Sequence, residues 1–208
     1  APITLIVTVP YVVVVNPSLP VRSLKELLAL ARARPGELLW SSSGNGSAQH
    51  LTLELLKMMT GVKITHVPYK GTAPGMTDLI AGRVSATSAS AVATLPHVNA
   101  GRLRALAVAG RTRAKIAPQL PTVAESGIPG FEIEVWHGAM APAGTPQDIV
   151  AKLHAEFVKI LAQPDLKERM LAVGFEPVGD PPDKFAAFLR AEVEKWSKVV
   201  REAGIRID

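Results

Sequence analysis

The sequence contains no cysteine, few aromatic residues and no long apolar run. The absence of cysteine excludes disulfide scaffolds, thiolate zinc sites, iron–sulfur clusters and cysteine nucleophiles. Aromatic residues make up 5% of the chain, too few for a surface on which nucleic-acid bases stack. The longest apolar run, Val12 to Val15, ends at Asn16-Pro17 and is far shorter than the ~20 residues that span a bilayer. We therefore expect a globular protein without a nucleic-acid partner.

The composition is that of a folded protein with a modest positive charge. Hydrophobic residues make up 48% and charged residues 20% of the 208 residues, which excludes a disordered chain. This length accommodates one large domain or two small lobes. The formal net charge of +5 suits the attraction of small anions as well as of nucleic acid, but no recognition helix is visible.

Strand-like and helix-like segments alternate over most of the chain. The predicted strands are 5–15, with a bend or break at Pro10, then 38–41, 63–67, 84–87, 103–108 and 131–136. The predicted helices among them are 23–33, 47–59, 72–82 and 91–100. Repeated strand–helix–strand units with short loops predict an α/β fold with a mostly parallel sheet, covered by helices on both faces.

From Thr145 onward the pattern is helical. Thr145 is the expected N-cap of a helix whose buried stripe comprises Ile149, Leu153, Phe157 and Ile160. Two further helices are predicted at 165–173 and 183–203.

These segments predict one complete lobe and part of another. We assign residues 10–136 to a complete α/β ligand-binding lobe, and residues 1–9 and 137–208 to crossing strands and the remainder of the other lobe. The first lobe is therefore expected to be incomplete. No basic and apolar leader precedes Ala1, so we expect that any signal peptide is already gone from this sequence.

The most informative segment is the loop between the predicted strand 38–41 and the helix that follows it. Its residues are Ser42, Ser43, Gly44, Asn45, Gly46 and Ser47. Free N–H groups at a helix N-terminus and the positive end of the helix dipole favour an anion, and the glycines allow an oxygen to approach the backbone closely. Capping by Ser47 and a simple chain turn explain the same residues about as well.

Catalytic, nucleotide and metal interpretations of this loop are weak. A dinucleotide fingerprint fails because Gln49 stands where the third glycine is needed, and no Gly-Lys-Ser/Thr phosphate loop or Gly-x-Ser-x-Gly elbow occurs. We interpret His50 as the maker of a local hydrogen bond rather than as a catalytic base. His50 and Glu54 have helical spacing for a metal pair but lack a third ligand. We expect no enzyme activity, no metal and no cofactor.

Two further segments lie at predicted strand ends. Lys70 follows the strand 63–67 and is interpreted as a solvated loop lysine rather than a carboxylate partner. Ser88, Ala89 and Ser90 form a second run of small residues, which supply either donors to the same ligand or a helix cap.

Several motifs in the same order resemble one family. They run from Ser42 to Leu51, His66 to Gly71, Pro96 to Leu106, Pro121 to Gly127 and Ala141 to Pro146. They are similar to the extracytoplasmic solute receptors of tripartite tricarboxylate transporters, also called Bug-type receptors, and the resemblance covers essentially the whole chain. It implies a type II fold like that of periplasmic binding proteins, with two lobes of mostly parallel sheet that close on a small carboxylate.

The resemblance also implies the site and the partners. Ser42, Gly44, Asn45, Gly46 and Ser47 match the carboxylate-binding loop of such receptors, with N–H donors from Gly44 to Ser47 and a hydroxyl donor from Ser42. His50 matches the histidine of that motif, in a supporting role. The expected partners are the ligand and the membrane permease subunits, and the expected location is the periplasm.

Two departures and one rival interpretation accompany the resemblance. The chain begins at what we interpret as a crossing strand, so the family's first strand and glycine-rich loop are not in it. The small residues Ser88 to Ser90 stand where relatives carry bulkier ones, which suggests a roomier pocket or a different carboxylate. The rival function is the effector-binding domain of a LysR-type transcription regulator, which shares the two-lobed plan.

Overall fold

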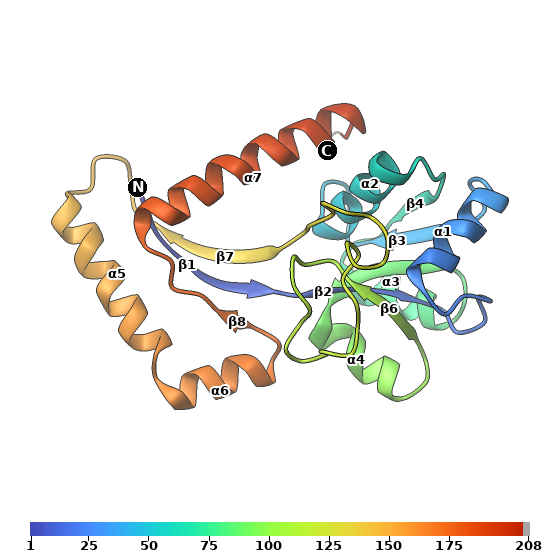
Figure 1. Ribbon diagram of the computed structural model, residues 1–208, viewed down its shortest axis with the longest axis horizontal. Helices are drawn as coiled ribbons and strands as arrows, with labels where there is room; N and C mark the ends of the chain where they lie inside the picture. The colour runs from blue at the N-terminus through green and yellow to red at the C-terminus, as the bar shows by residue number, and fades with distance from the viewer. Residues whose placement is uncertain (206–208) are drawn as a thin grey trace.

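Pro10 divides the first apolar run into two strands that belong to different sheets. In the computed structural model, which describes residues 1–205, β1 (Pro2–Val9) lies in a three-stranded sheet and β2 (Tyr11–Val15) in a five-stranded sheet (Figure 1). Proline donates no ladder hydrogen bond, so it interrupts the pairing at this point. The predicted bend or break at Pro10 is confirmed as the point where the chain crosses between sheets.

The larger sheet has the order β4-β3-β5-β2-β6. Its other strands are β3 (Leu39–Ser42), β4 (Thr65–Pro68), β5 (Ala86–Ser90) and β6 (Arg104–Val108). β3 pairs in parallel with β4 and β5, whereas β2 is antiparallel to β5 and β6. Four strands therefore run in one direction, as the repeated strand–helix units predict. β2 runs the other way because it enters from the smaller sheet without a crossover helix.

Helices cover both faces of this sheet. Successive valines of β2 point to opposite sides, so both faces carry apolar side chains that must be buried. The four helices are α1 (Leu24–Ala33), α2 (Ala48–Thr60), α3 (Thr72–Ile80) and α4 (Ala91–Asn99). Val13 and Val15 pack in one core with the apolar residues of α1 and α2. Val12 and Val14 pack in a second core with those of α3 and α4.

The smaller sheet has the order β7-β1-β8 and is antiparallel throughout. It comprises β1, β7 (Val135–Met140) and β8 (Glu176–Pro177). The expectation of mostly parallel strands is wrong for this sheet, since no helix connects strands in the same direction within it. The strand predicted at 131–136 begins later, because Phe131 and Ile133 are buried in the core of the larger sheet outside any strand.

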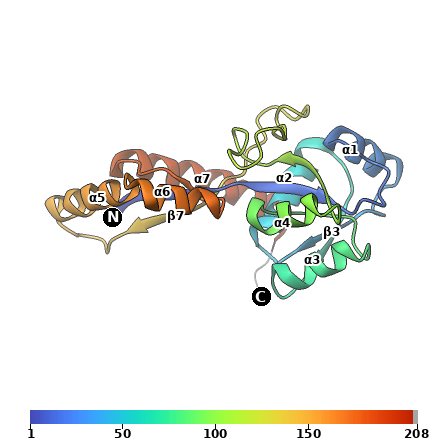
Figure 2. The same ribbon diagram turned by 90° about the horizontal axis from the view of Figure 1, so that it is seen from below.

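Three helices surround the smaller sheet and give the molecule an elongated shape. They are α5 (Gln147–Leu161), α6 (Pro164–Ala172) and α7 (Pro182–Glu202). α5 and α6 lie at one end of the molecule and the larger sheet at the other (Figure 2). α7 contacts both β1 and α2, with Phe185 buried near its start and Val199 in the core of the larger sheet. No helix among residues 1–205 is long and apolar enough to cross a membrane.

The buried face predicted for α5 is wrong at three of its four residues. Ile149, Leu153 and Ile160 are 47%, 39% and 46% exposed, and the residues that α5 buries are Val150 and Leu161. Phe157, the fourth residue of the predicted stripe, is half-buried. Thr145 is also not the N-cap, since Pro146 occupies that position and the Thr145 hydroxyl donates to the Pro142 carbonyl.

This exposed stripe predicts self-association. A contiguous apolar patch on a helix favours contact between copies, so we expect the average mass of the protein to rise with concentration. Ile149→Lys with Leu153→Lys should abolish that rise, as measured by sedimentation velocity. Ala151→Lys with Ala155→Lys adds the same charge at exposed positions of the same helix and should leave the rise unchanged. An equal response of both double variants would show that charge, and not the stripe, controls association.

Candidate functional site

The loop between β3 and α2 is shaped by two glycines and a cap. Gly44 and Gly46 have φ values of 134° and 72°, which other residues adopt only with strain. A Cβ atom at Gly44 would lie 3.6 Å from the Tyr69 carbonyl oxygen. Ser47 is the N-cap of α2, and its hydroxyl accepts a hydrogen bond from the His50 backbone N–H at 3.4 Å. The predicted strand–loop–helix arrangement is present.

The Ser42 hydroxyl is engaged within the protein. Its Oγ lies 2.6 Å from Nε2 of His66 and accepts from the Gly44 N–H at 3.2 Å. It also lies 3.1 Å from the Gly44 carbonyl oxygen. One hydroxyl provides one donor and two acceptor positions, so these contacts use its full capacity. Ser42 therefore shapes the loop.

Two histidine side chains contact the loop. The rings of His50 on α2 and His66 on β4 are stacked, with centroids 3.7 Å apart and an angle of 5° between their planes. Nδ1 of His50 accepts a hydrogen bond from the Gly46 N–H at 3.1 Å. The prediction that His50 makes a local hydrogen bond is thus confirmed. His66 was not predicted as a site residue, although its parallel alignment beside β3 could have indicated it.

Burial keeps both imidazoles neutral. Burial lowers the pKa of His50, and Lys57 adds to this, while Glu54 acts in the opposite direction. Burial, the neighbouring His50 and Lys57 lower the pKa of His66 to about 4. At neutral pH each ring therefore has one nitrogen that accepts a hydrogen bond.

Gln49 connects the loop to the next helix, a role that the sequence did not indicate. Its side-chain oxygen accepts from the Ser43 hydroxyl at 2.7 Å, and its amide donates to the Thr72 hydroxyl at 3.0 Å. Its backbone carbonyl accepts from the indole of Trp40 at 3.2 Å. The side chains of Ser43, Gln49 and Thr72 thus tie the loop to the start of α3.

The free N–H groups of the loop differ from those expected. Gly44 and Gly46 donate to Ser42 and His50, and Ser47 donates to the Gly44 carbonyl at 3.3 Å. Across the described part of the chain, the N–H groups of Asn45, Ala48 and Gln49 have no protein acceptor. Three donors at the positive end of a 13-residue helix suit one anionic oxygen group. Of the four donors expected from Gly44 to Ser47, only that of Asn45 is free.

The second run of small residues lies at the end of β5. In the parallel pairing of β3 with β5, Trp40 is aligned with Ala86 and Ser41 with Thr87. Extending this register by one residue aligns Ser42 with Ser88, so the two serines are on the same face of the sheet. Ser88 is fully buried, and its hydroxyl has no partner within residues 1–205. Ala89 faces the other core, with Val12. Ser90 is the N-cap of α4, but its hydroxyl makes no capping bond.

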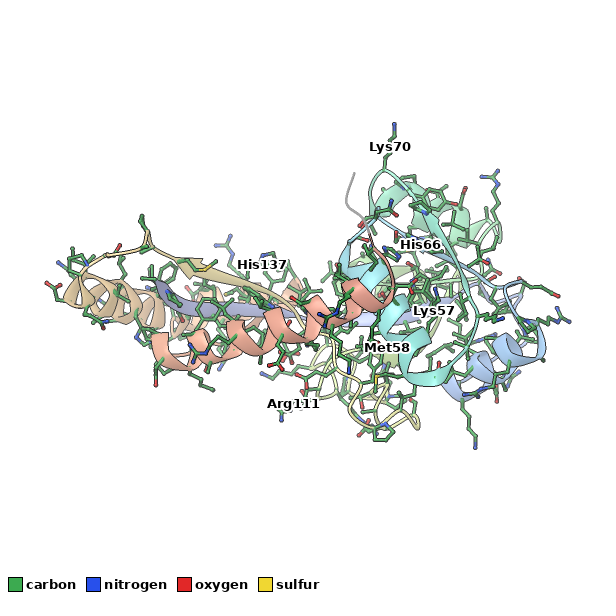
Figure 3. All side chains as sticks on the ribbon, turned by 90° about the horizontal axis from the view of Figure 1, so that it is seen from above. Lys57, Met58, His66, Lys70, Arg111 and His137 are labelled. Atoms are coloured by element: carbon green, nitrogen blue, oxygen red, sulfur yellow. The ribbon has the colours of Figure 1, made fainter. Side chains whose placement is uncertain are left out.

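Lys70 is exposed and extends away from the body of the molecule, which confirms its interpretation as a solvated lysine (Figure 3). Within residues 1–205, no cluster of three histidine or acidic side chains is arranged to hold a metal ion.

The chain matches one receptor family and several individual proteins along most of its length. The family described as "Tripartite tricarboxylate transporter family receptor" matches residues 1–205. Protein BugT of Bordetella pertussis is 38% identical over 206 residues, covering 99% of this chain and 63% of BugT. A protein from the tcbD-tcbE intergenic region of Pseudomonas sp. strain P51 is 39% identical over 202 residues, covering 97% of this chain and 60% of its own length. The chain spans about three fifths of the length of these curated relatives.

Solved structures agree in fold. Rpa4515 of R. palustris with adipate is 42% identical, with a TM-score of 0.84, and the match covers 98% of this chain and 68% of that one. MatC of Rhodopseudomonas palustris with bound malate is 30% identical, with a TM-score of 0.79, covering 96% of this chain and 69% of that one. The periplasmic binding protein BugD is 34% identical, with a TM-score of 0.81, covering 99% and 69%.

These likenesses confirm the predicted α/β fold of periplasmic binding proteins, and they identify a family of solute-binding receptors rather than of enzymes. The chain belongs to the receptor family of the tripartite tricarboxylate transporters.

Proposed function

We propose that the protein captures a small dicarboxylate in the periplasm and passes it to the membrane permease subunits of a tripartite tricarboxylate transporter. The observation that carries the proposal is the group of free N–H donors of Asn45, Ala48 and Gln49 at the start of α2. They supply charge-assisted hydrogen bonds to one carboxylate. The relatives with adipate and malate support a dicarboxylate as the ligand class.

The proposed site lies at the edge of one lobe. We assign residues 10–136 to that lobe, and residues 1–9 and 137–208 to the crossing strands and part of the other. Closure of the second lobe over the loop would exclude water and strengthen the hydrogen bonds to the carboxylate. Ser88 supports the proposal, because its buried hydroxyl faces the same side of the sheet as Ser42 and has no partner among residues 1–205.

The rival function, effector binding in a LysR-type regulator, has less support. The match to the receptor family extends over residues 1–205, and the solved periplasmic binding protein BugD shares the fold.

Removing a single N–H group tests the proposed site. Ala48 is the first residue of α2, a position where proline is favoured, and the preceding Ser47 has the extended conformation that proline requires (φ −67°, ψ 161°). Ala48→Pro therefore deletes one donor without breaking the helix. We expect adipate and malate to bind the intact protein, and Ala48→Pro to weaken the better ligand about tenfold or more, measured by calorimetry.

The matched control is a proline at the same position of another helix. Gln147 is the exposed first residue of α5, far from the loop in the fold, and Gln147→Pro should leave the affinity unchanged. If Ala48→Pro binds as tightly as the unmodified protein, the carboxylate does not lie at the start of α2. If neither dicarboxylate binds the unmodified protein, the proposed ligand class is wrong.

A further inference from the structure

We propose that His50 is a positioning residue of the anion loop, that His66 holds its ring in place, and that protonation of His50 releases the loop and weakens anion binding. The inference deepens the proposed function and rests on the carboxylate site at the start of α2. His50 contributes no bond to the ligand in this proposal. It acts through Gly46, the residue between Asn45 and the helix.

The hydrogen bond from Gly46 determines which nitrogen of His50 carries the proton. A backbone N–H can only donate, so Nδ1 of His50 must accept and must be unprotonated. The ring proton of neutral His50 is therefore on Nε2, which lies 3.5 Å from Oε1 of Glu54. This tautomer leaves the Gly46 N–H occupied and the neighbouring Asn45 N–H free to face a ligand.

His66 fixes the plane of the His50 ring. Its ring stacks on that of His50 at 3.7 Å, and its Nε2 is anchored by the Ser42 hydroxyl at 2.6 Å. Because the Ser42 hydroxyl donates to the Gly44 carbonyl, Nε2 of His66 donates to that hydroxyl, and this bond is kept when His66 is protonated. The Gly46 N–H, in contrast, can only donate, so its bond is lost when Nδ1 of His50 is protonated. Of the two imidazoles, His50 is therefore the one whose protonation breaks a bond of the loop.

The charged groups around His50 come from two helices and one strand. On α2, Glu54 lies next to Nε2 of His50 and also pairs with Lys57 at 2.8 Å. Glu202 of α7 lines a groove with Glu54 and Lys57 that does not include His50. β4 contributes His66. β3 contributes only the neutral Ser42 at this point.

The direction of the pH effect follows from these contacts. The pKa of His50 is lowered by burial, so the ring is neutral at pH 7 and becomes charged only as the pH falls below its ordinary value of 6.5. The charged ring has no acceptor for the Gly46 N–H, and the loop must turn to satisfy that donor. In this proposal, the loss of the bond that orients Gly46 and the neighbouring Asn45 N–H outweighs the screened attraction between the charged ring and the anion. Anion affinity therefore falls toward acid pH.

Two substitutions separate this effect from the ligand's own titration. His50→Asn places a side-chain oxygen where Nδ1 accepts but cannot be protonated, whereas His50→Leu has no acceptor. The measured quantity is the adipate Kd of the intact protein divided by that of His50→Asn at the same pH, so the ionisation of adipate cancels. We expect a ratio near one at about pH 8 and about ten at about pH 5. His50→Leu should bind weakly at both pH values.

A second measurement does not depend on ligand. In nitrogen-detected NMR of the protein without adipate, His50 should show an unprotonated Nδ1 at about pH 8. The Gly46 amide signal should then shift with the titration of His50. A ratio that stays near one or falls below one at acid pH overturns the proposal, as does a Gly46 amide that is insensitive to His50. Absence of adipate binding by both proteins with a normal Gly46 response would instead overturn only the proposed ligand.

Discussion

Replacing Gly138 with alanine is expected to destabilise the protein by about 2–3 kcal/mol, the upper range for overpacking of a tight contact. A Cβ atom at this position in β7 would lie 2.3 Å from Cζ of Phe185 and 3.0 Å from both Cε atoms. Phe185 is fully buried and makes an edge contact with Trp136, with ring centroids 5.8 Å apart. Since φ of Gly138 is not positive, the cost is steric and not one of backbone strain.

Urea denaturation measures this cost directly. Gly110→Ala is the matched control, because its Cβ would meet its nearest neighbour, the Thr112 carbonyl oxygen, at an ordinary 3.6 Å. Its stability should change by less than about 0.5 kcal/mol. Phe185→Leu removes the ring atoms that clash, so Gly138→Ala should cost much less in that background. A cost that persists unchanged in the Phe185→Leu protein would rule out the ring contact as the cause.

The arrangement of the larger sheet could be predicted because its signals are local. Pro10 cannot continue a ladder, and the valines from Val12 to Val15 leave no polar face, which indicates helices on both sides. The orientation of α5 could not be predicted in the same way. Periodicity identifies the apolar residues of α5, but it does not show which of them are buried. Val150 and Leu161 are buried and Ile149 is exposed, and this depends on how the helix packs against β1.

The loop was predictable in outline and not in detail. Glycine spacing and the Ser47 cap are local features that the sequence displays. The acceptors of the Gly44, Gly46 and Ser47 N–H groups are local. The side chains that hold the loop in place come from farther away, since His66 reaches Ser42 across 24 positions and Thr72 reaches Gln49 across 23. The acceptors are visible in the sequence, but which N–H group each of them engages depends on the folded conformation of the loop.

The second large effect is expected at Glu192 of α7. Its carboxylate is buried, and its Oε2 accepts from the indole N–H of Trp196 at 2.9 Å and that of Trp136 at 3.3 Å. Its Oε1 pairs with Lys195. Glu192→Ala leaves the two indole N–H donors without an acceptor at the junction of β7 and α7, and it removes the ion pair of Lys195. We expect a loss of about 3 kcal/mol in the free energy of unfolding.

Glu192→Gln separates the hydrogen bonds from the charge. Its amide oxygen, placed at the Oε2 position, can still accept from both indoles, so only the Lys195 pair is lost and the cost should be about 1 kcal/mol.

The same variant removes a negative neighbour of Glu134, whose pKa is raised by burial, Glu132 and Glu192. The pKa of Glu134 should therefore fall in Glu192→Gln, as followed by carboxyl NMR. Glu194→Ala, at an exposed position of the same helix, should change neither quantity. Equal destabilisation by Gln and Ala at position 192 would show that the ion pair, and not the two indoles, holds α7 to β7.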